Sequence, residues 1–165
     1  MIKGSCLCVR VAYEIAGPLT DVVNCHCGMC RKAHGAAFRT RATVQAADFK
    51  WTRGENHITW YCSSPGNYRG FCEACGTPLL SRLDQTPEVY GLPLGALDDD
   101  PGVRPSAHCH VADRAPWFEI TDDLPRHDGA LEAAAESIPS GLAAMRVCPT
   151  AQGSGAIYKL IQPNG

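Results

Sequence analysis

The chain has 165 residues, of which 45% are hydrophobic and 19% are charged, and its formal net charge is −2. This length and composition are typical of one globular domain with a buried core and argue against wholesale disorder. The charge is nearly neutral and no long basic run occurs, which argues against a nucleic-acid partner, because phosphate contacts need clustered lysine and arginine.

The N-terminus and the hydropathy pattern predict a cytoplasmic protein with no membrane partner. The opening stretch "MIKGSCLCVRVAYEI" lacks the apolar core of a signal peptide, and no stretch approaches the roughly 18 apolar residues of a membrane span. The ten cysteines of a cytoplasmic chain should stay reduced. Clustered reduced cysteines are more often metal ligands or catalysts than disulfides.

Short strands separated by turn residues predict a mostly β domain. The alternation in "VRVAYEI" places four side chains on one face of a strand, namely Val9, Val11, Tyr13 and Ile15. The stretch "MCRKAHG" predicts one short helical turn that ends at Gly35. Further strands are predicted at residues 38–44, 48–53, 57–63, 77–83 and 88–94. No long amphipathic helix precedes residue 129, which favours antiparallel sheets.

The composition changes after Asp128. Residues 129–165 are rich in small side chains, with a predicted helix over Ala130–Glu136. We therefore divide the chain into a domain over residues 1–128 and a C-terminal extension over residues 129–165. The sequence leaves the role of this extension open.

Two short cysteine pairs, far apart in the sequence, supply four candidate zinc ligands. Cys6 and Cys8 form C-x-C in "GSCLC", and Cys72 and Cys75 form C-x-x-C in "FCEACGTPL". Structural zinc sites are tetrahedral and are commonly built from such pairs. A site of this kind would tie the first strand to a later hairpin and contribute directly to folding.

The stretch "CHCGMC" supplies a second cluster, made of Cys25, Cys27 and Cys30. Three protein ligands leave one tetrahedral position open, which is how catalytic zinc differs from structural zinc. All-thiolate ligation suits the binding and exchange of another sulfur, so the expected incoming ligand is a thiol. The alternative is a second structural site in which a fourth residue completes the set, namely His26, Cys62 or Cys109.

Three further residues near the cysteines are candidates for substrate contacts. Arg31 follows the second cluster and can hold a carboxylate of a glutathione-like substrate, with solvated surface charge as the alternative. Phe38 can line a substrate pocket or pack in the core. Arg69 precedes the second cysteine pair and either reaches toward the site or pairs with a surface carboxylate.

In their order and spacing, four motifs resemble those of the glutathione-dependent formaldehyde-activating enzyme family, which also includes centromere protein V. These motifs are "GSCLC", "CHCGMCRKAHGAAF", "GNYRGFCEACGTPL" and "HCHVADRAPWFEITDDLP", and they cover about residues 3–128. The resemblance implies a β-tent fold of stacked antiparallel sheets. It also implies a structural zinc ion on Cys6, Cys8, Cys72 and Cys75 and a catalytic zinc ion on Cys25, Cys27 and Cys30. The family activity joins formaldehyde to glutathione as S-hydroxymethylglutathione, formally a carbon–sulfur lyase reaction in reverse.

We therefore predict a cytoplasmic carbon–sulfur lyase or synthase that holds two zinc ions per chain and acts on a thiol such as glutathione. Two alternatives stay open. One is carbon–sulfur cleavage of another thiol conjugate, for example in secondary metabolism, and the other is a non-catalytic, zinc-stabilised binding module. Whether the chain forms a homodimer is also open.

Overall fold

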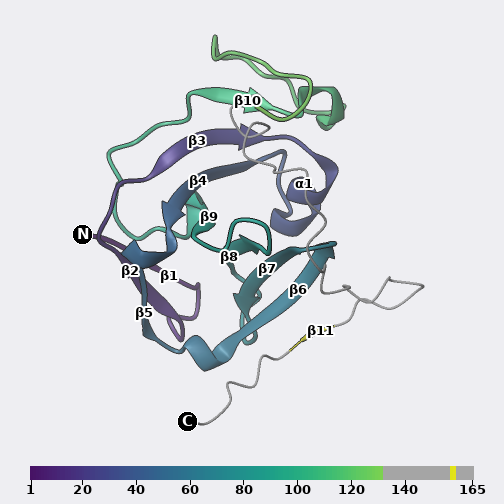
Figure 1. Cartoon of the computed structure of the whole chain (residues 1–165). Helices are drawn as coiled ribbons and strands as arrows, with labels where there is room; N and C mark the ends of the chain where they lie inside the picture. The colour runs from purple at the N-terminus through teal and green to yellow at the C-terminus, as the bar shows by residue number, and fades with distance from the viewer. Residues whose placement is uncertain (132–156, 159–165) are drawn as a thin grey trace.

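The computed structural model describes residues 1–131 and 157–158. These residues form two β-sheets, a short α-helix and four single-turn 3-10 helices, at Ala46–Asp48, Glu55–His57, Leu94–Ala96 and Val111–Asp113 (Figure 1). The smaller sheet has the strand order β1-β2-β5, and its three strands are antiparallel. Its strands are β1 (Ile2–Ser5), β2 (Ala12–Ile15) and β5 (Phe49–Arg53).

The larger sheet has the strand order β10-β3-β4-β9-β8-β7-β6-β11. Its strands are β3 (Thr20–Cys25), β4 (Arg39–Gln45), β6 (Ile58–Ser64), β7 (Asn67–Cys72), β8 (Pro78–Leu83), β9 (Val89–Pro93), β10 (Ala107–Cys109) and β11 (Ile157–Tyr158). Neighbouring strands are antiparallel except β10 and β3, which are parallel. Helix α1 (Gly28–His34) connects β3 to β4.

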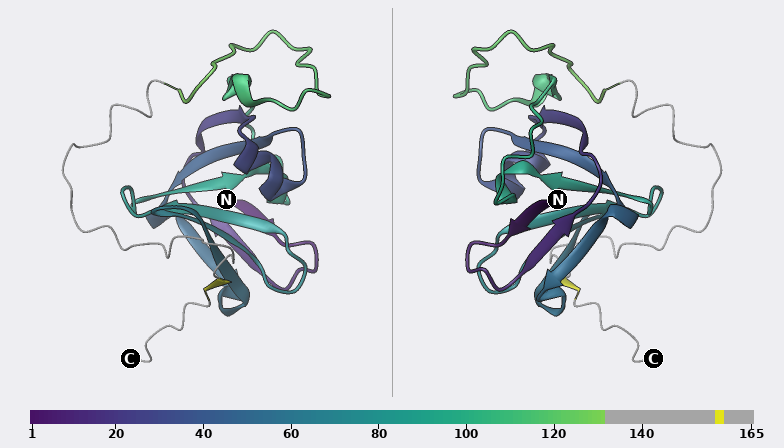
Figure 2. Two further views of the ribbon diagram at one scale, coloured as in Figure 1. Left: turned by 90° about the vertical axis from the view of Figure 1, so that its right-hand side faces the viewer. Right: turned by 90° about the vertical axis from the view of Figure 1, so that its left-hand side faces the viewer.

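Side chains from both sheets pack together in the main core, so the prediction of a mostly β domain of stacked sheets is confirmed. The largest members of this core are fully buried: Val11, Tyr13, Ile15, Val44, Leu79 and Leu92. Each such side chain stabilises the fold by roughly 1.5–3 kcal/mol relative to an exposed one. Helix α1 lies beside the start of β4, away from the smaller sheet (Figures 1 and 2).

The packing of Tyr13 requires a glycine on the neighbouring strand. Gly4 faces Tyr13 in the β1–β2 register, and a Cβ atom at residue 4 would overlap the tyrosine ring. The ring cannot move aside freely, because its hydroxyl donates to the Ala96 carbonyl at 3.2 Å. We expect Gly4→Ala to lower the free energy of unfolding by about 1–3 kcal/mol, as overpacking does. Urea denaturation measures this, with Gly95→Ala as a control, because a Cβ atom there meets nothing within 4 Å. Equal stability of the two variants would contradict the packing.

The first predicted strand begins later than expected, and this corrects the sequence-based boundary. Val9 is 58% exposed and has a φ of 52°, because residues 6–11 form the turn that carries the first cysteine pair. The strand starts at Ala12, so Val9 does not share a buried face with Tyr13. The helix predicted to end at Gly35 is confirmed, and this glycine has the expected left-handed conformation with a φ of 57°.

Two other expectations concern the ends of the chain and the membrane. Most of the helix predicted over Ala130–Glu136 lies outside the described residues. Within the described ranges, no helix has the length and apolar content needed to span a bilayer.

Candidate metal centres and active site

The first cysteine cluster brings together four sulfur atoms that all lie within 4.8 Å of one another. The Sγ atoms of Cys6 and Cys8 are 3.5 Å apart, and those of Cys8 and Cys72 are 3.8 Å apart. Four sulfurs placed ~2.3 Å from one zinc ion at tetrahedral angles lie roughly 3.8 Å from one another. Together with Cys75, these side chains therefore fit a tetrahedral Cys₄ zinc site.

Tight backbone turns shape this first cluster. The Val11 N–H group donates to Cys6 Sγ at 3.3 Å, and the Cys6 N–H group donates to the Val11 carbonyl at 3.0 Å. On the second turn, the Gly76 N–H group donates to the Cys72 carbonyl at 2.9 Å, with a Gly76 φ of 74°. Backbone N–H groups that donate to sulfur favour the thiolate form that zinc needs.

The first cluster also connects the two sheets. Cys6 and Cys8 lie in the turn between β1 and β2 of the smaller sheet, whereas Cys72 ends β7 of the larger sheet. Cys8 and Cys72 are 64 residues apart in sequence. A metal ion bound here would therefore cross-link the two layers of the domain.

The second cluster forms where β3 passes into helix α1. Cys25 is the last residue of β3, Cys27 is the N-cap of the helix and Cys30 lies in its first turn. The three Sγ atoms lie within 4.8 Å of one another. The Cys30 N–H group donates to Cys27 Sγ at 3.4 Å, so the start of the helix itself positions the Cys27 sulfur.

The position of Cys109 bears on whether this cluster has a fourth ligand. Cys109 faces Cys25 in the parallel β10–β3 register, and the two thiols hydrogen-bond to each other. Among the described residues, however, no fourth histidine, cysteine, aspartate or glutamate lies within 4.8 Å of all three sulfurs. This geometry favours a three-ligand site with one open position over a closed structural site.

We expect Cys109→Ala to leave the metal content of the protein unchanged. Cys109 interacts with Cys25 but does not lie within 4.8 Å of all three sulfurs, so its removal leaves the three ligands in place. The measurement is the zinc content of purified protein by atomic emission, with wild type as reference. A loss of one metal ion per chain in this variant would make Cys109 a ligand and the site a closed one.

His26, which lies between two cysteines of the second cluster, belongs to a buried hydrogen-bonded chain. Its Nε2 atom is 2.7 Å from His108 Nδ1, and His108 Nε2 is 3.0 Å from Asp122 Oδ1. The ring is fully buried, and its centroid is 5.1 Å from that of Phe38. Burial, followed by the neighbouring His108, lowers the pKa of His26 and keeps it neutral. His26 therefore supports the loop between Cys25 and Cys27.

Two guanidinium groups place positive charge beside the second cluster. Arg69 Nη2 lies 3.8 Å from Cys30 Sγ. Hydrogen bonds from Cys25 and Cys27 lower the pKa of Cys30 far below its usual value, and the charges of Arg69 and Arg39 lower it further. Cys30 is therefore the sulfur of this cluster that is best prepared to carry negative charge, whereas the pKa values of Cys25 and Cys27 are raised.

Arg39 is buried and fixed by the sheet. Its Nη2 atom donates to the Gly91 carbonyl at 2.9 Å and its Nη1 atom to Ser81 Oγ at 3.2 Å. Burial lowers the pKa of Arg39 to about 10, so the guanidinium stays charged at neutral pH. Gly91 leaves the room for this arrangement, because a Cβ atom there would lie 2.6 Å from Ser81 Oγ.

The structure places the predicted substrate residues as follows. Arg31 Nε donates to the His26 carbonyl at 3.2 Å. The Phe38 ring packs on His26 and, at 5.4 Å between centroids, on Phe118, and it lines a cavity. The roles of Arg31 and Phe38 in substrate binding stay predictions. Arg69 does approach the cluster, as one of its two interpretations anticipated.

Comparison with family models matches residues 1–113 to a family described as glutathione-dependent formaldehyde-activating enzyme. The chain belongs to this family. The matched range contains both cysteine clusters of the chain and ends just after β10, which carries Cys109.

A solved structure also resembles this member of the formaldehyde-activating family. It is the crystal structure of a protein from Rhodobacter sphaeroides, with 30% sequence identity and a TM-score of 0.50. The match covers 62% of this chain and 91% of that chain. A search of curated proteins finds no match to the sequence.

Proposed function

We propose that the protein is a zinc-dependent carbon–sulfur lyase or synthase that joins a thiol to an aldehyde and reverses that reaction. Glutathione and formaldehyde are the pair that the family description names. The observation that carries this proposal is the second cluster, in which three sulfurs converge beside two guanidinium groups and no fourth ligand is found in the described part of the chain. The first cluster would hold a second, structural zinc ion.

In this proposal, Cys25, Cys27 and Cys30 hold the catalytic ion. A zinc ion in such a site would offer one open position and would lower the pKa of an incoming thiol, so that the thiol could be held as thiolate. Arg69 and Arg39 stabilise the negative charge that gathers there, because both guanidinium groups lie close enough to Cys30 to lower its pKa. His26 and His108 keep the loop that carries Cys25 and Cys27 in place.

The reaction is an addition, so it needs neither oxidant nor reductant. The thiol sulfur forms a bond to the aldehyde carbon, and the carbonyl π-bond becomes a hydroxyl group. The proton that the thiol loses ends on the aldehyde oxygen, with water as the carrier. In the cleavage direction the carbon–sulfur bond breaks, and the departing sulfur leaves as a thiolate beside Arg69.

The thiols of both clusters are free in the structure, which suits a reducing compartment. We therefore assign the protein to the cytoplasm. Cys62, in contrast to these thiols, is disulfide-bonded, which corrects the expectation that all ten cysteines stay reduced. We further propose that residues 1–128 form the catalytic domain and that residues 129–165 are an extension of it.

The test is NMR exchange spectroscopy on formaldehyde, glutathione and their adduct, with and without zinc-loaded protein. We expect exchange between free and adduct signals to accelerate with the wild-type protein. Metal-free protein should give the uncatalysed rate. No acceleration by protein that carries two zinc ions would exclude this substrate pair.

A further inference from the structure

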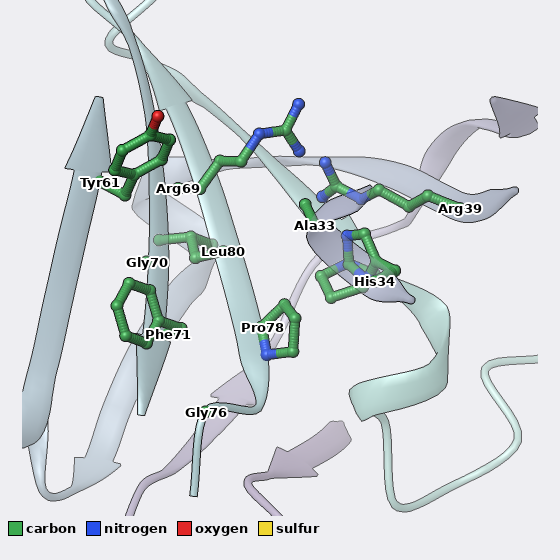
Figure 3. Close-up of a pocket in the computed structure, with 11 residues that line it drawn as sticks. Ala33, His34, Arg39, Tyr61, Arg69, Gly70, Phe71, Gly76, Pro78 and Leu80 are labelled. Atoms are coloured by element: carbon green, nitrogen blue, oxygen red, sulfur yellow. The ribbon is translucent and has the colours of Figure 1, made fainter. Parts of the chain in front are cut away.

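A cavity of about 280 Å³ opens next to the second cluster, between helix α1 and strands β7 and β8 (Figure 3). It begins one helical turn beyond Cys30, because Ala33 and His34 follow that residue at the i+3 and i+4 positions of the same helix face. Its walls are largely apolar and include Tyr61, Gly70, Phe71, Pro78, Leu80 and Pro93. The cavity is therefore shaped to receive an apolar group close to the cysteine sulfurs.

Positive charge is concentrated at one end of this cavity. Arg39 and Arg69 line it, and Figure 3 shows their guanidinium groups side by side, above His34. Neither arginine forms an ion pair with a carboxylate of the described residues, and no acidic residue is among those that line the cavity. Two adjacent cations in a partly desolvated site repel each other, so an anion bound between or beside them would be stabilised.

The two guanidinium groups differ in how much of their hydrogen-bonding capacity the protein uses. Arg39 donates hydrogen bonds to Ser81 and Gly91, and its positive charge helps to lower the pKa of Cys30. Among the described residues, Arg69 donates one hydrogen bond, from Nη2 to Cys30 Sγ, and the Nε atoms of both arginines are buried without a hydrogen-bond partner. Arg69 thus has donors left for a ligand in the cavity, whereas Arg39 has few.

The sheet register explains why Arg69 faces this cavity. Arg69 pairs with Tyr61 on β6 and with Ser81 on β8, and directly paired residues lie on the same face of a sheet. Tyr61, Arg69 and Ser81 therefore form one row across three strands. The neighbouring pair, Tyr68 and Arg82, belongs to the opposite face, where Arg82 stacks on the rings of Trp60 and Tyr68.

His34 contributes a neutral polar edge to the same end of the cavity. Burial and the charge of Arg39 lower the pKa of His34 to about 4. At neutral pH the imidazole is therefore uncharged, and it can hydrogen-bond to a ligand without adding a third positive charge.

We propose that this cavity selects a thiol that bears a carboxylate one or two carbons from its sulfur and an apolar, preferably aromatic, body. The carboxylate would bind Arg69, and the apolar body would pack on Phe71 and Leu80. The short spacing between sulfur and carboxylate follows from the 3.8 Å between Arg69 Nη2 and Cys30 Sγ. A thiol bound at the cluster can place its carboxylate on Arg69 only if its sulfur and its carboxylate are close together. This inference rests on the proposed function, since it places the thiol at the second cluster.

Glutathione matches this cavity less well than an apolar mercapto acid does. Its glutamyl ammonium group and its peptide groups would meet apolar walls and two cations, with no acidic residue to bind the ammonium. Burial of such groups without partners is unfavourable. The natural substrate of the cleavage direction would accordingly be a conjugate of an apolar mercapto acid.

Isothermal titration calorimetry on the zinc-loaded full-length protein tests this inference with four probes: 2-mercapto-3-phenylpropanoate, its primary amide, the thiol-free 3-phenylpropanoate, and glutathione. We expect the mercapto acid to bind about tenfold or more tightly than its amide, as a charge-assisted hydrogen bond would give. It should also bind more tightly than glutathione. Arg69→Gln should remove the preference for the acid over the amide, and Arg69→Lys should restore part of it. The matched control is Arg82→Gln, which deletes the same charge on the opposite face and should leave all four affinities unchanged.

The thiol-free acid separates failure of this inference from failure of the proposed function. If 3-phenylpropanoate binds in an Arg69-dependent way but the thiol adds no affinity, the cavity is as proposed and thiol binding at the cluster is wrong. If the thiol adds affinity but acid and amide bind alike, the proposed function stands and the carboxylate site is overturned. Equal weakening of acid and amide by Arg69→Gln would also overturn it. Circular dichroism and zinc content establish that each variant is folded and loaded.

Discussion

Replacement of Cys72 with serine is expected to unfold the domain and to reduce its zinc content. Cys72 is fully buried in the first cluster, where its Sγ atom lies 3.8 Å from that of Cys8. A serine hydroxyl is a much weaker zinc ligand than a thiolate. Binding of a structural zinc ion contributes on the order of 10 kcal/mol in small zinc domains, which is comparable to the whole stability of a typical domain. Loss of one ligand therefore removes most of the net stability.

Thermal unfolding followed by circular dichroism, together with zinc analysis, measures this effect. The expected result is that Cys72→Ser shows no cooperative transition, as should wild-type protein treated with a strong chelator. Cys109→Ala serves as the control, because it also deletes a buried thiol but not one of this cluster. If the serine variant melted cooperatively within a few degrees of wild type, the first cluster would not be what holds the two sheets together.

Replacement of Cys27 with serine is expected to abolish turnover while the fold persists. Cys27 is the N-cap of α1, and its sulfur accepts the Cys30 N–H group. Serine is among the best N-cap residues, so the helix start should be preserved and the free energy of unfolding should change by about 1 kcal/mol or less. The loss of one of three metal ligands should reduce the rate of thiol–aldehyde exchange by about a hundredfold or more, since even outer partners of a metal cost 10–100-fold.

Exchange NMR and thermal unfolding of the same Cys27→Ser sample distinguish the two hypotheses, that the protein is an enzyme and that it is a binding module. An enzyme with a separate structural site gives an inactive variant with a nearly unchanged melting temperature. A module in which both metals hold the fold together gives a variant that unfolds. Full activity in this variant would exclude the second cluster as the catalytic centre. Cys109→Ala is again the matched control, expected to retain both activity and stability.

The cysteine spacings were informative because zinc ligation places strict local demands on a chain. Two pairs and one triplet could be assigned to two clusters from the sequence alone, and the structure gathers the same sulfurs into the same two groups. Strands with alternating burial, such as Ala12–Ile15, were also recognised. Strand β3 was missed because its last four residues are all buried, so that no alternation marks it. Strand β10 was missed because it has only three residues.

The surroundings of the second cluster could not be predicted from local pattern. Arg39 reaches Ser81 and Gly91 across 42 and 52 residues of sequence, and His26 meets His108 across 82. Such partners depend on strand order and register, which spacing within a motif does not reveal. For the same reason, Asp122 behind His108 and the neutral His34 in the cavity carried no recognisable signal.

The separation of 64 residues between Cys8 and Cys72 has a consequence for biosynthesis. The first two sulfur ligands leave the ribosome long before the second two, and until then they are an exposed, reactive pair of thiols on a nascent chain. Metal can therefore join the two sheets only after β7 has emerged, and β10, which flanks the second cluster, comes later still. The two sheets should therefore join late in synthesis and only when zinc binds. Zinc starvation should then impair the folding of newly made chains more strongly than it destabilises mature ones.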